Sequence, residues 1–322
     1  MERISAAGLA ELNEICPGGV HQKVSLAQMS QWGIGGIADL IIRPSSTCQL
    51  SDLRRWFYRN DVHHLTIGST SNLLFADDGL RAPCIQLGNH LSRITIDNDM
   101  VYAQAGVWVP ILARQLMMAD LTGGEHICGI PGTLGGLVCM NGGSQRKGIG
   151  SNVISVESVG PTGDITLRMA VECRFAYRHS VYQSNDETIT SVTLMFDKGR
   201  GADIRHNMLG ILASRRQKFP RKLPNCGSVF KSNPAMYSEI GPPGMAIEKL
   251  GFKGIRKGGA QVSPQHANFI VNTGGATASD VLKLIAEISK KVKLSTGYYM
   301  EPEALYVTPD GKVVSIDSIL DR

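Results

Sequence analysis

Glycine is concentrated in one stretch of this sequence, and that stretch strongly constrains how the chain can fold. Six glycines fall in the fifteen residues from 129 to 143, among apolar side chains. Residues without a Cβ atom let the main chain approach another group closely, and Pro131 stiffens the turn. We therefore predict that this segment lies against a flat or extended ligand. A purely structural tight turn is the alternative interpretation.

A second loop of small polar residues, 68–72, directly follows a predicted buried strand at 62–67. Such a loop leaves main-chain N–H groups free to face an anion, as in phosphate-binding nests. An ordinary polar turn is the alternative. The pattern G-x-G-x-x-A at 33–38 also suggests a dinucleotide site, but it lacks the preceding strand and following helix that this motif requires. We therefore reject a Rossmann site there.

The composition indicates a folded globular protein and excludes several other classes. The 322 residues suffice for two or three domains, with 43% hydrophobic and 19% charged residues. A net charge of +5 is too small to indicate a nucleic-acid partner. The seven cysteines are scattered, which argues against disulfides and zinc and for buried thiols. We expect no metal site, no membrane span and no signal peptide, and therefore a cytoplasmic protein.

The periodicity of apolar residues predicts an α+β protein. Helices are predicted at 47–60, around 208–212, at 109–118 and at 279–293, the last with a capping box between Thr277 and Asp280. Extended segments are predicted at 62–67, 100–105, 153–159, 164–175, 188–196 and 298–316. The composition changes near residue 200, which suggests a domain boundary at about 200–205.

Three further clusters contain candidate functional side chains. Arg178 stands beside Tyr177 at a strand end, where it suits a carboxylate clamp. Ser228 lies in a Gly-Ser turn after the basic run 215–222, and acidic residues stand at 301 and 303. Taken singly, each cluster has the alternative interpretation of an ordinary solvated surface.

The order of these motifs along the chain closely resembles the UDP-N-acetylenolpyruvoylglucosamine reductase (MurB) family, from about residue 22 to residue 316. The segments that carry the resemblance are 30–39, 68–74, 129–136 with Asn141, 177–180, 227–231, 254–261 with 266–272, and 301–303. The short link between 182 and 188 is similar to the type II members of the family.

The resemblance implies an α+β fold with a two-part FAD-binding region of the vanillyl-alcohol-oxidase type and a C-terminal α+β substrate domain. The expected domains are 1–82, 83–203 and 204–322, with segment 298–322 returning to the FAD region. It also implies NADPH-dependent reduction of UDP-N-acetylglucosamine enolpyruvate by a monomeric FAD enzyme of peptidoglycan synthesis, with no nucleic-acid or membrane partner.

Each site residue is likewise implied by the resemblance. The expected catalytic set is Arg178, Ser228 and Glu303. The residues expected to hold FAD are Gly68, Ser69, Thr70, Ser71, Asn72, Gly129, Ile130, Pro131, Gly132, Thr133, Gly135, Gly136 and Asn141. Those expected to contact the substrate are Tyr177, Lys218, Lys231, Asn233 and His266.

The chain departs from the family pattern at a few positions. The family loop usually has glycine where Thr70 stands, and a β-branched residue is strained if this position needs a positive φ. The family commonly has Asn-Pro directly after the position of Lys231, whereas here Ser232 stands between Lys231 and Asn233-Pro234. Three alternatives therefore stay open: another oxidoreductase on the same scaffold, a nucleotide-sugar binding protein without catalysis, and a basic nucleic-acid module.

Overall fold

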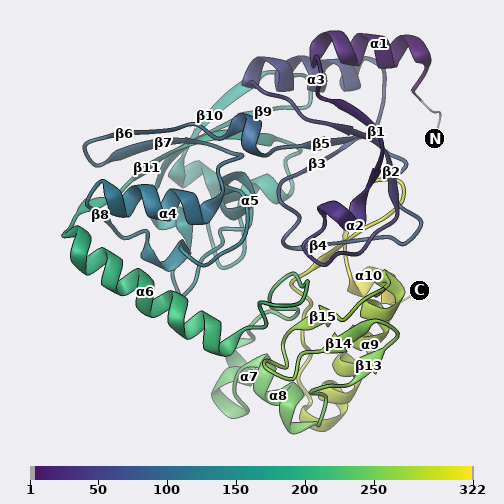
Figure 1. The fold of residues 1–322 in the computed structure, drawn as a ribbon, viewed down its shortest axis with the longest axis vertical. Coiled ribbons are helices and arrows are strands. Elements are labelled where there is room, and N and C mark those ends of the chain that lie inside the picture. The colour runs from purple at the N-terminus through teal and green to yellow at the C-terminus, as the bar shows by residue number, and fades with distance from the viewer. Residues whose placement is uncertain (1–3, 321–322) are drawn as a thin grey trace. The chain divides into compact units, whose positions relative to one another are not determined.

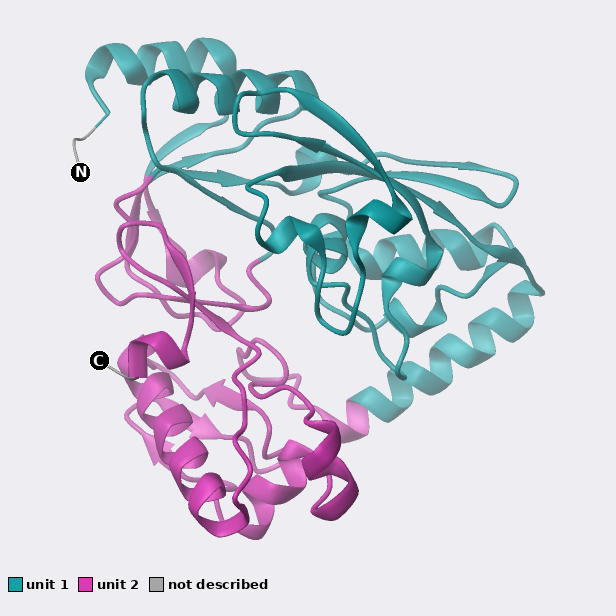
Figure 2. Cartoon of the chain, turned by 180° about the vertical axis from the view of Figure 1, so that it is seen from behind, with its two compact units in different colours: residues 1–22, 40–69, 83–215 teal, residues 23–39, 70–82, 216–322 magenta. Residues whose placement is uncertain are grey.

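The computed structural model describes residues 4–320, which divide into two compact units (Figure 2). Unit 1 comprises the described residues up to Gln22, Leu40–Ser69 and Pro83–Arg215. Unit 2 comprises Lys23–Asp39, Thr70–Ala82 and the residues from Arg216 onward. The last passage of the chain from unit 1 to unit 2 falls between Arg215 and Arg216, inside helix α6 (Gly201–Lys218). The three-domain division stays a prediction.

The helices and strands of the described residues are short and numerous. The α-helices are α1 (Ala6–Ile15), α2 (Leu26–Met29), α3 (Thr47–Arg59), α4 (Val109–Met118), α5 (Leu134–Cys139), α6 (Gly201–Lys218), α7 (Pro234–Glu239), α8 (Pro243–Lys249), α9 (Ala278–Thr296) and α10 (Asp317–Leu320). Short 3₁₀ helices include η1 (Asn89–Leu91), η4 (Ala170–Cys173) and η5 (Val181–Gln183).

The strands form five small sheets. They are β1 (Val20–Ser25), β2 (Ile37–Ile42), β3 (Leu65–Ile67), β4 (Leu73–Phe75), β5 (Cys84–Gln86), β6 (Ile94–Asp97), β7 (Met100–Gln104), β8 (Leu121–Thr122), β9 (Val153–Val159), β10 (Ile165–Met169), β11 (Thr188–Met195), β12 (Asp197–Lys198), β13 (Arg256–Lys257), β14 (Ala260–Val262), β15 (Ile270–Asn272), β16 (Leu305–Val307) and β17 (Val313–Ser315).

The two largest sheets share one hydrophobic core in unit 1. In the sheet ordered β1-β2-β5-β3, the strands β2, β5 and β3 run parallel. The five strands ordered β10-β9-β11-β7-β6 are antiparallel, and α4 and α5 lie along one face of this sheet (Figure 1). The amphipathic helix α3 buries Leu50, Leu53 and Phe57 in the same core. This core fixes the ends of the parallel strands.

Unit 2 has its own core between helix α9 and the sheet β13-β14-β15. Helix α9 buries its apolar stripe, and Thr277 and Asp280 form the expected capping box at its start. A second sheet, ordered β17-β16-β4, pairs the C-terminal strand β16 in parallel with β4. This pairing fixes the residues just before β16 relative to the loop just before β4.

The structure confirms the predicted helices and corrects some of the other expectations. Helix α4 has the predicted bounds, whereas the extended segment 164–175 ends at Met169, because η4 and a left-handed residue at Arg174 follow. The G-x-G-x-x-A pattern follows helix α2 and ends inside strand β2, the reverse of the strand-to-helix order that the Rossmann motif requires, so this motif is absent there. Cys48 is exposed rather than buried. Among the described residues, no helix is both long and apolar enough to cross a membrane.

Candidate functional site

The pocket of unit 1 lies at the carboxyl edge of its three parallel strands. Arg43 follows β2, Gly68 follows β3 and Leu87 follows β5, so the three strand ends meet at one edge. The cavity has a volume of about 350 Å³. Its lining residues are Arg43, Gly68, Ser69, Gln86, Leu87, Gly88, Asn89, His90, Gly106, Trp108 and Thr133. Ligands of open sheets with parallel strands bind at this edge.

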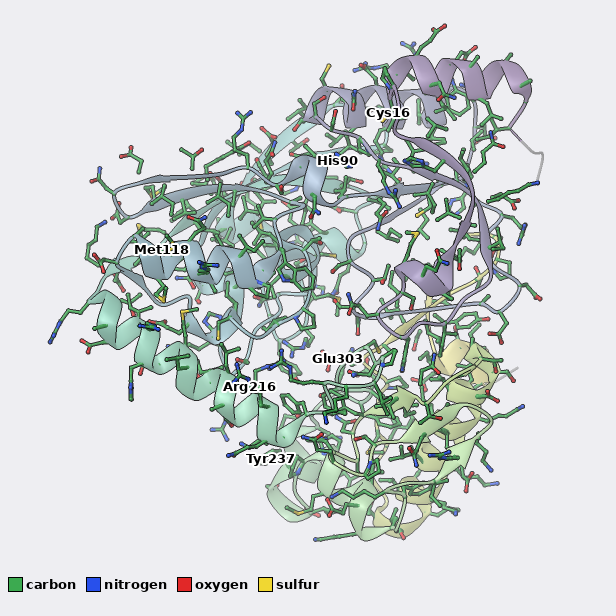
Figure 3. All side chains as sticks on the ribbon, in the orientation of Figure 1. Cys16, His90, Met118, Arg216, Tyr237 and Glu303 are labelled. Atoms are coloured by element: carbon green, nitrogen blue, oxygen red, sulfur yellow. The ribbon has the colours of Figure 1, made fainter. Side chains whose placement is uncertain are left out.

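Charged and polar groups line this pocket beside apolar surface. The Arg43 Nε donates a hydrogen bond of 2.8 Å to Gln86 Oε1, which fixes the guanidinium at the pocket. His90, labelled in Figure 3, comes from η1. Arg43 and His90 are close enough to His21 to lower the pKa of its imidazole, although burial is the larger cause. A fixed guanidinium at the pocket suits a ligand that carries phosphate groups.

The close packing around residue 68 requires a glycine at this position. A Cβ atom at this position would lie 2.3 Å from Thr133 Oγ1, which no real contact tolerates. Its φ is not in the left-handed region, so the close approach alone excludes a side chain. Gly68 and Thr133, the residue just before α5, are thereby packed against each other in unit 1.

Residues 70–72 of the loop belong to unit 2, where Asn72 connects them to Glu303. Asn72 Nδ2 donates to the main-chain oxygen of Glu303 at 3.0 Å, and Leu305 N donates to Asn72 O at 3.0 Å. The side-chain amide of Asn72 is therefore used to hold the chain that carries Glu303 (labelled in Figure 3). The expected FAD contact of Asn72 stays a prediction.

The glycine-rich segment 129–136 pairs with another main-chain segment. Val109 N donates to Gly132 O at 2.9 Å, and Gly135 N donates to Ala105 O at 2.8 Å. A Cβ atom at Gly135 would lie 2.9 Å from the Ala105 Cβ atom, and one at Gly129 would lie 2.6 Å from Arg215 Cδ. Protein atoms thus occupy the Cβ directions of these two glycines. At these two positions the main chain approaches other protein atoms closely, whereas the sequence analysis expected a ligand as the neighbour.

Arg178 lies on a tight turn in unit 1. Ala176 and His179 exchange two main-chain hydrogen bonds of 3.1 Å, which leaves Tyr177 and Arg178 as the central residues. Arg178 has a φ of +54°, and its guanidinium carbon lies 5.4 Å from the centre of the Tyr177 ring. The exposed Tyr177 ring and the Arg178 cation therefore lie together at the tip of the turn.

Ser228 and Glu303 lie on neighbouring extended segments in unit 2. Glu303 N donates to Val229 O at 2.7 Å, and Lys231 N donates to Glu301 O at 2.9 Å. Gly227 precedes Ser228 with a φ of +86°, which only glycine adopts without strain. Burial raises the pKa of the Cys226 thiol, and the nearby carboxylate of Glu303 raises it further. The structure therefore brings two of the three predicted catalytic residues together within one unit.

Two of the predicted substrate contacts have protein partners in unit 2. Lys231 Nζ forms an ion pair of 2.5 Å with Glu301 Oε1. Asn233 caps helix α7, where its Oδ1 accepts from Ala235 N at 3.0 Å. The Asn233 carbonyl thus serves the helix end that follows Ser232. Their expected roles toward the substrate stay predictions.

Two further predicted substrate contacts, His266 and Lys218, lie near an aromatic cluster of unit 2. His266 packs against Phe219 and Phe269, with ring centres 5.4 and 5.0 Å away. Burial lowers the pKa of His266, and the nearby cations Lys253 and Lys218 lower it further. At neutral pH His266 is therefore a neutral hydrogen-bonding group. Lys218 is exposed at the end of α6.

Sequence reasoning missed most of the pocket lining. Arg43, Gln86, His90, Gly106 and Trp108 were not predicted as site residues, and they come from three separate segments of the chain. A local signal existed only for Arg43, which lies between the apolar run 40–42 and Pro44. A side chain at Gly106 would lie 2.0 Å from Gly88 O, a constraint that only the structure shows.

Comparisons with known proteins agree with this geometry. A family model described as an FAD binding domain matches residues 38–167, which include every residue that lines the pocket. A model described as the C-terminal domain of UDP-N-acetylenolpyruvoylglucosamine reductase matches residues 219–307, which include Ser228 and Glu303. The matched FAD-binding region therefore contains the whole pocket.

Similar proteins span nearly the whole chain. A UDP-N-acetylenolpyruvoylglucosamine reductase 1 from Corynebacterium glutamicum is 44% identical over 300 residues, which are 93% of this chain and 90% of that relative. One from Syntrophomonas wolfei is 35% identical over 282 residues, 88% of this chain and 93% of the relative. The crystal structure of the Thermus caldophilus reductase matches with a TM-score of 0.74 and 28% identity, and covers 88% of this chain and 97% of that one. The expected α+β fold with an FAD-binding region is confirmed.

Proposed function

The chain belongs to the UDP-N-acetylenolpyruvoylglucosamine reductase family, and on this premise we propose that it reduces the enolpyruvyl ether of UDP-N-acetylglucosamine to UDP-N-acetylmuramate, with NADPH as the electron donor. The observation that carries the proposal is the pairing of the Ser228 segment with the Glu303 segment, next to strand β4 and loop 68–72. That pairing places a hydroxyl donor and a carboxylate in one part of unit 2.

FAD, when bound, supplies hydride transfer from NADPH to the terminal carbon of the enolpyruvyl double bond. In this proposal the residues that line the pocket would hold FAD, and Arg43, Gly68 and Ser69 would offer hydrogen-bond donors to its phosphate groups. The neighbouring carbon then carries negative charge shared with the carboxylate. Arg178 stabilises that charge as a fixed cation. Its place on a turn closed by two hydrogen bonds limits the reorganisation that it needs.

Ser228 donates the proton that completes the reduction. Its hydroxyl gives the proton to the carbon beside the carboxylate, and one hydride and one proton together saturate the double bond. A serine hydroxyl is a weak acid, so its contribution depends on placement. Gly227 and the hydrogen bonds around Val229 fix that placement. Glu303, on the paired segment, orients the proton donor or the substrate carboxylate.

The substitution Ser228→Ala tests this assignment in the two half-reactions separately. We expect FAD to bind and NADPH to reduce it at a rate close to that of the wild type. Reoxidation of the reduced flavin by the enolpyruvyl substrate should slow by about 10²- to 10⁴-fold, the usual contribution of a general acid. Stopped-flow absorbance of the flavin measures both steps.

Ser232→Ala is the matched control, since Ser232 is an exposed serine four residues later. Reoxidation at the wild-type rate in Ser228→Ala would remove Ser228 from the mechanism. A wild-type protein that stays colourless after incubation with excess FAD would exclude the proposed function altogether. A flavoprotein that NADPH bleaches but the enolpyruvyl substrate does not reoxidise would indicate another oxidoreductase.

A further inference from the structure

Thr70 adopts a backbone conformation that its side chain disfavours. Its φ is +59°, in the left-handed region where β-branched residues are rare. The residue is only 4% exposed, so solvent does not satisfy its hydroxyl group. A conformation of this kind persists only where the surroundings hold it in place.

The hydroxyl group of Thr70 makes the contacts that hold it. Thr70 Oγ1 donates to the main-chain oxygen of Met29 at 3.2 Å and accepts from Gln31 N at 3.3 Å. The hydroxyl thus bridges the two sides of residue 30. Thr70 O in turn accepts from Leu73 N at 3.2 Å, which closes the turn into strand β4.

The segment that Thr70 contacts is itself fixed to the core of unit 2. Trp32 is fully buried, and its Nε1 donates to Ile270 O on strand β15 at 2.7 Å. Asn272 Nδ2 donates to Trp32 O at 3.1 Å. Residues 29–32 therefore give the hydroxyl a rigid anchor.

We propose that Thr70 is a positioning residue for the bound dinucleotide: its hydroxyl holds loop 68–72 in the shape that receives the diphosphate of FAD. A glycine would reach the same φ without strain but would not be tied to residues 29–31. The inference rests on the proposed function, because it takes loop 68–72 as part of the FAD site. Thr70 acts through the loop and needs no contact with FAD.

Two matched pairs of side chains separate the hydroxyl from the rest of the residue. In the first pair, Thr70→Val replaces the hydroxyl of the wild type by a methyl group and keeps the shape of the side chain. In the second pair, Thr70→Ser keeps the hydroxyl and Thr70→Ala lacks it, and neither carries the γ-methyl group of threonine. Titration of each apoprotein with FAD, followed by flavin fluorescence, gives the dissociation constants. We expect Thr70→Val to raise the dissociation constant at least tenfold, and Thr70→Ser to stay within about threefold of the wild type, since its hydroxyl restores both bonds.

Urea unfolding of the apoproteins tests whether each variant folds. If Thr70→Val does not fold, the comparison of Thr70→Ser with Thr70→Ala gives the same answer. Equal affinities within both pairs would overturn the proposal, and so would a loss in Thr70→Ser as large as that in Thr70→Val, because the methyl group would then be decisive. Failure of the wild type to bind FAD would contradict the proposed function. Binding of FAD without turnover of the enolpyruvyl substrate would leave the inference about Thr70 intact.

Discussion

The side chain of Asn141 holds the main chain of Ala176, with Nδ2 donating to the carbonyl oxygen at 2.8 Å. At its other end, Asn141 Oδ1 accepts from Gly150 N at 2.9 Å. Ala176 is the first residue of the turn that carries Arg178, and the buried Ser180 anchors the far side of the turn by donating to Cys139 O at 2.6 Å. The amide of Asn141 thus ties the start of the Arg178 turn to the main chain at Gly150.

Substitution of Asn141 by Asp isolates the bond to Ala176, since a carboxylate still accepts from Gly150 N but cannot donate. We expect reoxidation of the reduced flavin by substrate to slow about tenfold, because Arg178 loses part of its fixed placement. Reduction by NADPH and the affinity for FAD should change little. Stopped-flow measurements of both half-reactions check this. A loss confined to FAD affinity would instead support the predicted contact of Asn141 with the flavin.

Gly68→Ala should weaken FAD binding at least tenfold, because the new Cβ atom would meet Thr133 Oγ1 at 2.3 Å and displace the loop. Thr133→Ala removes that oxygen, so the double variant should recover much of the affinity. The measurement is a double-mutant cycle of FAD dissociation constants, with an expected coupling of about 1 kcal/mol or more. Strictly additive effects would show that the two residues do not interact.

Asn268→Ala should destabilise unit 2 strongly. Asn268 is buried, its Oδ1 accepts from Phe230 N at 3.0 Å, and its Nδ2 donates to Phe230 O at 3.0 Å. The substitution leaves two buried main-chain groups without these partners. We expect the free energy of unfolding in urea to fall by about 2–4 kcal/mol. A loss below about 1 kcal/mol would mean that water replaces the amide.

The elements that the sequence predicted well are those whose pattern is local. Helices α4 and α9 bury one periodic stripe each, and the start of α9 is fixed by a capping box only four residues long. Segment 164–175 was predicted less well, because η4 and the left-handed Arg174 interrupt it after Met169. Alternation of apolar residues does not reveal such a turn.

The same distinction between local patterns and long-range pairing applies to the site residues. Loop 68–72 and the Gly-Ser turn before Val229 are recognisable from neighbouring residues alone. Arg43 and Gln86 become pocket neighbours only because β2 and β5 pair in parallel, and Asn268 meets Phe230 across 38 residues of chain. No local pattern encodes those pairings. The sequence predicted a ligand as the close neighbour of segment 129–143, whereas at Gly135 the neighbour is Ala105 of the protein itself, a contact that only the structure shows.

His64, which lies outside the site, packs between an aromatic ring and a buried cation. The ring of His64 stacks on Phe57 at 4.3 Å, and its Nε2 lies 2.7 Å from Nη1 of the buried Arg54. Burial lowers the pKa of His64 to about 4, and the Arg54 cation adds to the effect. The carbonyl oxygen of Val62, the carboxylate of Asp186 and the ring of His63 act on the same group more weakly.

The folded protein therefore favours neutral His64, whereas the unfolded chain protonates it near its ordinary pKa of 6.5. Because the unfolded state binds the proton more readily, the stabilisation is fully present above pH 6.5 and is lost as the pH falls toward about 4. The loss across this window is about 3 kcal/mol. Urea unfolding of the wild type and of His64→Gln, at several pH values from about 4.5 to about 7.5, should show a smaller slope of unfolding free energy against pH for the variant, since glutamine accepts from Arg54 without titrating. The exposed His63 provides the control, as His63→Gln should keep the wild-type slope. Equal slopes in the wild type and His64→Gln would show that His64 is protonated as readily in the folded protein as in the unfolded chain.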